Sequence, residues 1–171
     1  MANIPSICEE ATYTQIFKEY IKSLHNYLYY KTGNKAMSHD LAQEAFSKLW
    51  QNCAKVTMSG AKGYVFKTAN NLLIKEYNHQ KVVLNHQKQP QQQKTIQSPE
   101  FLLEEKEFKQ KLEDTIADLP EKQRVVFLLS RIDKKTYKEI AEIVGISKQA
   151  VEKRMYNALD TLRAVVSEKI R

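Results

Sequence analysis

The stretch from Thr136 to Leu162 constrains this chain more than any other, because it contains two amphipathic helix patterns separated by a glycine. Gly145 stands where a left-handed residue would end the first helix, and Ser147 can cap the second. The apolar positions of the first pattern are Tyr137, Ile140, Ala141 and Val144. Those of the second pattern are Val151, Met155, Ala158 and Leu162. Two helices joined by such a turn are typical of a helix-turn-helix, whose second helix fits the DNA major groove.

The outer face of the second helix is polar and long enough to read bases. It carries Lys148, Gln149, Glu152 and Lys153. The alternative interpretation is an ordinary helical hairpin whose charged face is only solvated, and the motif alone does not decide between the two.

The formal charge of +7 is spread unevenly along the 171 residues. Residues 1–85 carry a net charge of +4, residues 86–119 a net −2, and residues 120–171 a net +5. Two basic modules joined by a mildly acidic segment indicate two contacts with a polyanion, although lysine-rich surfaces also occur on proteins that bind nothing charged.

No segment is expected in a membrane. The longest aliphatic or aromatic run near the C-terminus, from Val125 to Leu129, is far too short to span one, and the N-terminal MANIPSICEE has no signal-peptide pattern. We therefore expect no membrane insertion and a cytoplasmic location.

The cysteines and glycines argue against a metal centre and against an enzyme. Cys8 and Cys53 form no metal-ligand spacing with any of the four histidines, so we interpret both as reduced thiols. The four glycines form no phosphate-binding cluster, and no Ser, His and acid arrangement is legible as a motif. We expect no metal, no cofactor and no enzymatic activity.

The first half of the chain begins with two helix patterns. The first ends in a turn around Gly33 and has on one face Phe17, Ile21, Leu24 and Leu28. The second is expected to start at Ser38 or Asp40 and to read DLAQEAFSKLW, with Phe46 stacked on Trp50 one turn later. Its packing face comprises Leu41, Ala45 and Leu49. Its outward stripe, which by itself is most simply a solvated face, comprises Asp40, Gln43, Glu44 and Ser47.

A third helix is predicted from about Ala61 to His79. Its inward residues are Val65, Ala69, Leu72 and Leu73. The other side carries, within about 80° at 3.6 residues per turn, Lys67, Asn71, Lys75 and Asn78. Such a stripe suits phosphates and base edges, although Ile74 interrupts it. The nearby aromatic residues, which either stack on unpaired bases or belong to the core, are Tyr64, Phe66 and Tyr77.

Residues 82–98 are Gln-rich, contain Pro90 and show no sustained helical period, so we expect a flexible linker. After it, Ser98 and Pro99 open a helix that runs through about Ala117, and Pro120 opens another that packs against the helix-turn-helix. The inward residues of the former are Leu112, Ile116 and Leu119. The expected fold class is all-α, with two small helical domains at residues 10–81 and 99–168, joined by the linker at 82–98; the second domain contains the helix-turn-helix.

The order of these motifs resembles the extracytoplasmic-function sigma factors of bacterial RNA polymerase. The segments that carry the resemblance are DLAQEAFSKLW, GYVFKTANNLLIKEY, LPEKQRVVFLLSRI and YKEIAEIVGISKQAVEKRMYNALDTLR, with a polar linker between the second and the third. The resemblance covers nearly the whole chain. It implies a subunit that directs core polymerase to promoters, recognises the −35 and −10 elements and assists DNA melting. The partners it implies are the β′ clamp helices and the β flap of core polymerase, promoter DNA, and an anti-sigma factor.

The resemblance also implies roles for individual residues. Matching the −35 recognition helix are Lys148, Gln149, Glu152, Lys153, Arg154 and Asn157. Matching the segment that reads the −10 element, where one base is flipped from the stack, are Lys62, Tyr64, Lys67, Asn70, Asn71 and Lys75. Matching the polymerase contacts are Asp40, Gln43, Glu44 and Ser47 for the clamp helices, and Arg124 and Phe127 for the flap.

The chain departs from the family pattern in ways that bear on promoter sequence. Residues 1–85 contain no arginine, Tyr64 stands where tryptophan is usual, and Glu152 stands where a basic residue is frequent. Lysine cannot make the bidentate fork of arginine, and a glutamate in the major groove prefers a cytosine amine, so we expect an unusual promoter sequence. The main alternative function is an autonomous helix-turn-helix regulator that binds DNA as a dimer. A helical adaptor that binds only protein would leave the two basic modules unexplained.

Overall fold

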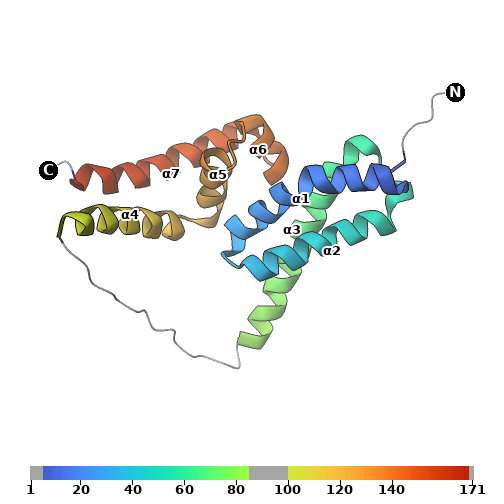
Figure 1. Cartoon of the computed structure of the whole chain (residues 1–171), viewed down its shortest axis with the longest axis horizontal. Helices are drawn as coiled ribbons and strands as arrows, with labels where there is room; N and C mark the ends of the chain where they lie inside the picture. The colour runs from blue at the N-terminus through green and yellow to red at the C-terminus, as the bar shows by residue number, and fades with distance from the viewer. Residues whose placement is uncertain (1–5, 85–99, 170–171) are drawn as a thin grey trace.

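The computed structural model describes residues 6–84 and 100–169, with side chains described over residues 6–78 and 107–165 and at 167. Its elements are α1 (Glu10–Thr32), α2 (Lys35–Gln51), the 3-10 turns η1 (Cys53–Lys55) and η2 (Met58–Gly60), α3 (Ala61–Leu84), α4 (Glu100–Asp118), α5 (Glu121–Arg131), α6 (Tyr137–Val144) and α7 (Lys148–Lys169). Helices α1 to α3 form one half of the molecule and α4 to α7 the other (Figure 1). The predicted all-α fold class is confirmed.

The junction between α1 and α2 is a tight turn. Gly33 has a φ of 65°, a left-handed conformation that glycine adopts without steric cost, and it ends α1 as predicted. Asn34 then caps α2, because its side chain accepts a hydrogen bond from the Met37 N–H at 3.0 Å. The predicted start of this helix at Ser38 or Asp40 is wrong, since Asn34 provides an earlier cap. Ser38 is instead buried inside the helix, where its hydroxyl donates to the Asn34 carbonyl at 2.7 Å.

Aromatic rings join α1 to α2. Phe46 is 1% exposed and contacts the rings of Phe17 and Tyr13 at centroid distances of 4.9 Å and 6.4 Å. Trp50 is 44% exposed and lies against Tyr13 at 4.9 Å. The predicted stacking of Phe46 on Trp50 is wrong, because among the described ring contacts each of them packs edge-on against a ring of α1.

The core of the first half follows the predicted faces of its three helices. Its fully buried members include Leu24, Leu28, Ala45, Leu49, Val65, Ala69 and Leu73. Phe17, Ile21 and Leu72 are half-buried at its edge. Helix α3 begins at Ala61 as predicted but continues to Leu84, because no glycine or proline interrupts the chain there. Residues 82–84 are therefore helical rather than linker, while residues 85–98 and the predicted cap Ser98 lie outside the described residues.

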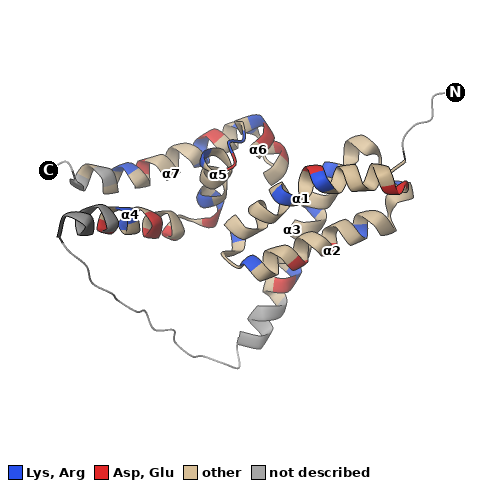
Figure 2. Ribbon diagram, viewed as in Figure 1, with Lys and Arg blue, Asp and Glu red and all other residues tan. Residues whose placement is uncertain are grey.

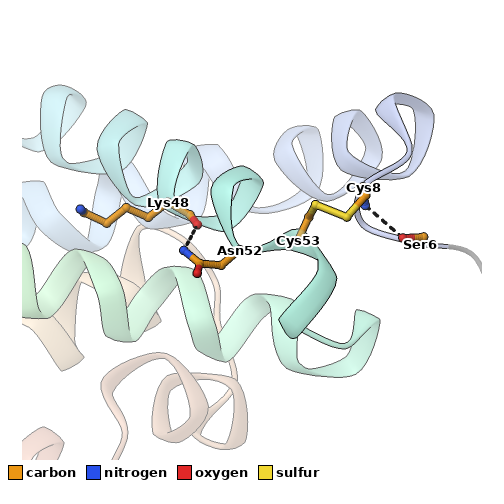
Figure 3. The surroundings of a disulfide bond; sticks show 5 residues. All are labelled: Ser6, Cys8, Lys48, Asn52 and Cys53. Atoms are coloured by element: carbon orange, nitrogen blue, oxygen red, sulfur yellow. Dashed lines mark hydrogen bonds between the residues drawn. A yellow bond between two sulfur atoms is a disulfide. The ribbon is translucent and has the colours of Figure 1, made fainter.

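A disulfide joins Cys8 to Cys53, with their Cα atoms 5.1 Å apart (Figure 3). The expectation of two reduced thiols is therefore wrong. The two cysteines are 45 positions apart, so no local spacing signals their pairing. They meet because α1 and α2 pack against each other in opposite directions, which brings the start of one beside the end of the other. The bond fastens the segment before α1, where Ile7 is 1% exposed, to the turn η1.

In the second half, α4, α5 and α6 pack around α7. Helix α4 lies along α7, and their shared apolar residues are Leu112, Ile116, Leu119, Ala158 and Leu162. Pro120 precedes α5 as its N-cap residue, as predicted, and Val125, Val126 and Leu129 of α5 are buried. Helix α5 contacts both α6 and α7 and so supports the helix-turn-helix.

The two halves of the molecule share one apolar core. The buried cluster that contains Leu24 and Phe46 of the first half continues into Val126, Ile140 and Met155 of the second. The contact runs from α1 to α5 and from α3 to α6 (Figure 1). The sequence predicts two modules that are able to sit apart, and it gives no signal for this contact, because each apolar residue also fits the core of its own half.

Arg124 of α5 binds carbonyl oxygens of both halves. Its Nε donates to the Tyr30 carbonyl at 3.1 Å, and its Nη2 lies 3.4 Å from the Lys31 carbonyl. Its Nη1 donates to the carbonyls of Ala117 and Leu119 at 2.8 Å and 2.9 Å. One guanidinium therefore satisfies the C-terminal ends of α1 and α4, where the helix dipole favours a cation.

Asp133, which follows α5, is half-buried in the seam between the two halves of the molecule. Oδ1 of Asp133 accepts from the Tyr30 hydroxyl at 2.7 Å and from the Asn26 amide at 3.0 Å. Oδ2 is buried and makes no hydrogen bond within the described residues. Burial, followed by the hydrogen bond to Asp133, raises the pKa of Tyr30 well above its usual value, so its hydroxyl remains a donor.

Replacing Arg124 with Ala tests how far this guanidinium holds the halves together. The variant leaves four carbonyls without their donor, so we expect the free energy of unfolding to fall by about 2–3 kcal/mol. Urea denaturation followed by circular dichroism measures the loss. The matched control is Lys122→Ala, which removes an exposed cation of the same helix and should change stability by less than about 0.5 kcal/mol. Equal stabilities of the two variants would contradict the role of Arg124.

Candidate DNA and polymerase interfaces

Helices α6 and α7 form the predicted helix-turn-helix. Thr136 and Glu139 make a reciprocal capping box at the start of α6, with the Glu139 carboxylate accepting from the Thr136 N–H at 2.8 Å. This hydrogen bond lowers the pKa of Glu139. Gly145 ends α6 with a φ of 75°, and the Ser147 hydroxyl caps α7 by accepting from the Ala150 N–H at 3.1 Å. The four inward residues predicted for α7 are all buried, namely Val151, Met155, Ala158 and Leu162.

The opposite face of α7 is open to solvent. The exposed residues among those predicted for −35 recognition are Lys148, Gln149, Glu152, Lys153 and Asn157. Lys148 and Glu152 form an ion pair at 3.5 Å across one turn. The acidic charge on this face is therefore balanced by a neighbouring cation while the helix is free.

The structure places Arg154 away from the open face of α7 and adds Tyr156 to that face. Arg154 is half-buried and lines a cavity of about 190 Å³ between the halves, together with Tyr27, Lys31 and Glu121. Its position directly before the buried Met155 puts it at the edge of the packing face. Tyr156 is 65% exposed on the polar face between Lys153 and Asn157, and sequence analysis missed it because an aromatic residue at helical spacing is usually part of the core.

The stripe predicted along α3 is also exposed. It consists of Lys67, Asn71, Lys75 and Asn78, with Ile74, 49% exposed, among them. Asn71 makes no hydrogen bond within the described residues, so its amide is available to a ligand. Phe66 is 4% exposed and belongs to the core, whereas Tyr64 is half-buried with its hydroxyl 3.5 Å from the Lys48 carbonyl. The interpretation as core therefore holds for Phe66.

Asn70 occupies a different environment from its neighbour Asn71. Its Oδ1 accepts from Lys31 Nζ at 2.6 Å and from the Tyr27 hydroxyl at 3.3 Å, and both donors come from α1. Burial raises the pKa of Tyr27 to about 12, which keeps its hydroxyl protonated as a donor. Lys31 also lies 3.5 Å from Glu121 of α5. Asn70 therefore has structural partners in this arrangement, which the sequence does not distinguish from a base contact.

Lys62, at the start of α3, pairs with the second half of the molecule. Its Nζ is 2.9 Å from Oε2 of Glu142 in α6, and this hydrogen bond lowers the pKa of Glu142. A second cavity of about 290 Å³ lies beside the pair, between α3 and the end of α6, and its lining includes Lys67, Asn70 and Gly145. Part of the predicted −10 surface therefore faces the helix-turn-helix instead of solvent.

The outward stripe of α2 is exposed along its whole length. It comprises Asp40, Gln43, Glu44 and Ser47. Its contacts are local: Gln43 lies 3.2 Å from the ring of His39, and Glu44 pairs with Lys48 at 3.6 Å. None of these contacts ties the stripe to another helix, so the face is free to bind a partner.

The two residues predicted to contact the polymerase flap are not on a free surface. Arg124 donates to four carbonyl oxygens, two from each half. Phe127 is half-buried between the core that the halves share and the apolar residues that join α4 to α7. They become accessible only if the halves separate or α5 is uncovered.

The distribution of charged and apolar residues over the described helices bears on three kinds of site: basic surfaces, metal centres and membrane spans. Lys and Arg residues occur on helices of both halves (Figure 2). Within the described part of the chain there is no cluster of His, Cys, Asp and Glu that could hold a metal ion. The described helices also include none that is both long and apolar enough to cross a membrane.

Each half of the molecule matches a known protein family, and the two matches follow each other along the chain as the two halves do. The family described as Sigma-70 region 2 matches residues 16–82, and Sigma-70, region 4 matches residues 109–162. The chain belongs to the extracytoplasmic-function sigma factors. The match to region 2 removes the main alternative, an autonomous helix-turn-helix regulator, because that class would share only the second half. A sigma factor recognises promoters for RNA polymerase and is not an enzyme.

Individual relatives extend the likeness over most of this sigma factor. It is 24% identical to the extracytoplasmic-function sigma factor SigM of Bacillus subtilis, over 93% of this chain and 98% of SigM. It is 25% identical to SigW of the same organism, over 91% of this chain and 89% of SigW. A similar fold is that of RpoE from Bartonella quintana, solved in complex with the anti-sigma factor NepR, with a TM-score of 0.62 and 15% identity over 91% of this chain and 96% of RpoE.

Proposed function

We propose that this sigma factor recognises promoter DNA through two helices and binds core polymerase through a third. Helix α7 enters the major groove at −35, α3 reads and helps to melt the −10 element, and α2 docks on the β′ clamp helices. The observation that best supports this proposal is that each of these helices presents a row of polar residues to solvent while its apolar face is buried in the core.

On α7, Gln149 and Lys153 lie one turn apart and supply an amide and a cation to base edges. Glu152 selects for a cytosine amine once Lys148 has moved to a phosphate and released it. The exposed ring of Tyr156 contacts a thymine methyl group or the sugar backbone.

On α3, Lys67 and Lys75 bind phosphates, and Asn71 between them binds the flipped base. An asparagine is a poor helix former, and it offers two donors and one acceptor on a short side chain. The full hydrogen-bonding capacity of Asn71 is unused by the protein itself, which supports a ligand as its partner.

Promoter binding requires the halves to separate. The two elements are centred about 25 base pairs apart, which is roughly 85 Å of duplex. Helices α3 and α7 cannot reach both elements while they are attached to one core. Separation also releases Lys62 from Glu142 for the −10 element and uncovers Arg124 and Phe127 for the β flap.

We extend the proposal to an anti-sigma partner and to a cytoplasmic location. The RpoE of similar fold was solved with an anti-sigma factor, and a protein that holds the halves of this chain together would keep its DNA-binding residues paired internally. The location is the cytoplasm because a sigma factor acts on RNA polymerase and on the chromosome, which lie there.

The decisive experiment is transcription in vitro with purified core polymerase and the full chain. We expect a one-to-one complex with core and transcripts that begin downstream of shared −35 and −10 sequences. DNA binding as a dimer without polymerase, and no complex with core, would contradict the proposal.

Changing Gln43 and Glu44 to Ala tests the polymerase contact on α2. Both side chains are exposed and make only local contacts, so stability should change by less than about 0.5 kcal/mol. Affinity for core polymerase, measured by fluorescence anisotropy, should fall. The matched control replaces the exposed pair Lys109 and Glu113 of α4 with Ala and should bind core normally. A large drop in melting temperature in the α2 variant would instead reveal a structural role.

Replacing Gln149 or Lys153 with Ala tests base readout by α7. Each change should weaken promoter binding by about 1–3 kcal/mol and relax preference at one or two −35 positions. A set of single-base −35 mutants, transcribed with each variant, measures that relaxation. Arg163→Ala removes an exposed cation further along the same helix and should leave the preference unchanged. If the Gln149 and Lys153 variants rank the mutant promoters as the wild type does, neither residue reads a base.

Asn71→Ala separates recognition of the duplex from its opening. The lost hydrogen bonds form only after the base has left the stack, so the closed complex should persist while open-complex formation falls by about 1–3 kcal/mol. Permanganate footprinting of the −10 element beside a gel shift of the closed complex measures both steps. Asn70→Ala provides the contrast, because it removes the acceptor of Lys31 and Tyr27 and should lower thermal stability. Normal melting of DNA with Asn71→Ala would assign the base contact elsewhere.

A further inference from the structure

We propose that Cys8 and Cys53 form a reversible thiol–disulfide switch whose oxidised state orders the segment that leads into the −10 surface of α3. The proposal rests on the proposed function of α3. The chain contains two cysteines in all, so oxidation within one molecule has a single product. Peroxide is the class of oxidant, and a dithiol is the class of reductant.

The position of the pair allows reagents to reach it. Cys8 is exposed and Cys53 is half-buried at the edge of the apolar core. The packing of α1 against α2 brings Cys8, just before α1, near Cys53, just after α2, with their Cα atoms 5.1 Å apart in the disulfide, so the two reduced thiols can meet and react with each other. Figure 3 shows the bond at the ends of these helices, beside the segment that contains Ser6.

The disulfide anchors a segment that has few other attachments. Helix α1 begins without a side-chain cap, because Glu9 at its N-cap position makes no such hydrogen bond. The preceding turn is held by the Glu9 N–H on the Ser6 carbonyl at 3.0 Å, by the Cys8 N–H on the Ser6 hydroxyl at 3.2 Å, and by the buried side chain of Ile7. The covalent bond is the strongest link between this turn and the rest of the protein.

On its other side the disulfide fixes the start of the connection between α2 and α3. Cys53 opens η1, directly after the end of α2, and Ala61 opens α3 eight positions later. Between them Val56 packs against the core, and the Thr57 hydroxyl caps η2 by accepting from the Gly60 N–H at 3.2 Å. The first turn of α3 then carries the −10 candidates Lys62 and Tyr64. The redox state of Cys53 therefore controls the freedom of the connection that positions these two residues.

The chemistry of oxidation balances with peroxide alone. The exposed Cys8 thiolate attacks hydrogen peroxide and breaks its O–O bond, giving a sulfenic acid and hydroxide. The Cys53 thiol then attacks that sulfur, the S–S bond forms, and water leaves. Two thiols lose two electrons and two protons in total, and the peroxide is reduced to two waters. A dithiol reverses the process by thiol–disulfide exchange and is itself oxidised to a disulfide.

Whether the Cys8–Cys53 bond forms depends on the redox state of the cytoplasm, where we propose that this sigma factor acts. Cellular reductants keep thiols reduced where RNA polymerase works, so disulfides found there are usually transient or redox-sensing. The reduced chain is then the resting form, and the disulfide forms when peroxide rises. Because a preordered loop loses less entropy on binding, the oxidised form should hold the single-stranded −10 element better.

The test compares oxidised and dithiol-reduced wild-type protein, each in complex with core polymerase on a promoter found by the transcription experiment. Alkylation and mass spectrometry verify two blocked thiols in the reduced sample and none in the oxidised one. Promoter opening is followed by 2-aminopurine fluorescence in the −10 element. We expect the oxidised protein to open the promoter about three- to tenfold faster, with unchanged affinity for core.

The variants Cys8→Ser and Cys53→Ser should open the promoter at the reduced rate and should not respond to peroxide. Equal opening rates for the two wild-type forms, faster opening by the reduced form, or a peroxide response in the serine variants would overturn the switch while leaving the function of α3 intact. Failure of peroxide to form the bond would also overturn it. If neither wild-type form opens any promoter, the proposed function of α3 fails and the switch with it.

Discussion

The closed form of this sigma factor, in which its two halves share one core, depends on one guanidinium that joins segments 94 positions apart in the chain. Arg124 donates to carbonyl oxygens at the C-terminal ends of both α1 and α4, and so determines how α5 lies against the first half. Helix α5 in turn supports α6 and α7. The orientation of the helix-turn-helix relative to α3 therefore follows from a cation placed at two helix C-termini, where the partial negative charges of both helices converge.

The seam around this cation is a set of opposite charges and amides that the two halves exchange. Glu121 and Glu142 of the second half lie beside Lys31 and Lys62 of the first. In the proposed mechanism Lys62 turns to the −10 element, so the Glu142 carboxylate takes the place of nucleic acid while the halves are together. Salt and a polyanion both compete with such pairs, because they are partly exposed and only modestly stabilising.

Local features of the fold could be predicted from the sequence, and contacts between distant segments could not. The buried stripe of α7, the end of α6 at Gly145 and the polar row on α3 follow from helical periodicity and cap chemistry, which are properties of neighbouring residues. The disulfide, the partners of Asn70 and the role of Arg124 depend on how helices pack, and no spacing encodes them. The start of α2 was misplaced because Asn34, Ser38 and Asp40 are all competent caps, and the turn at Gly33 favours the first of them.

The unpartnered oxygen of Asp133 gives the seam a built-in tendency to open. Oδ1 of this carboxylate accepts hydrogen bonds from Tyr30 and Asn26, whereas Oδ2 is buried and accepts none from the described residues. The carboxylate therefore loses hydration when the halves close. Water restores that hydration as soon as they part. The apolar core favours the closed form while this charge opposes it, so the free-energy difference between the two forms is smaller than the buried area suggests. A chain poised in this way responds to weak competitors, and a partner shifts the population toward the open form when it binds groups that only this form exposes, as we propose for the β flap at Arg124 and Phe127.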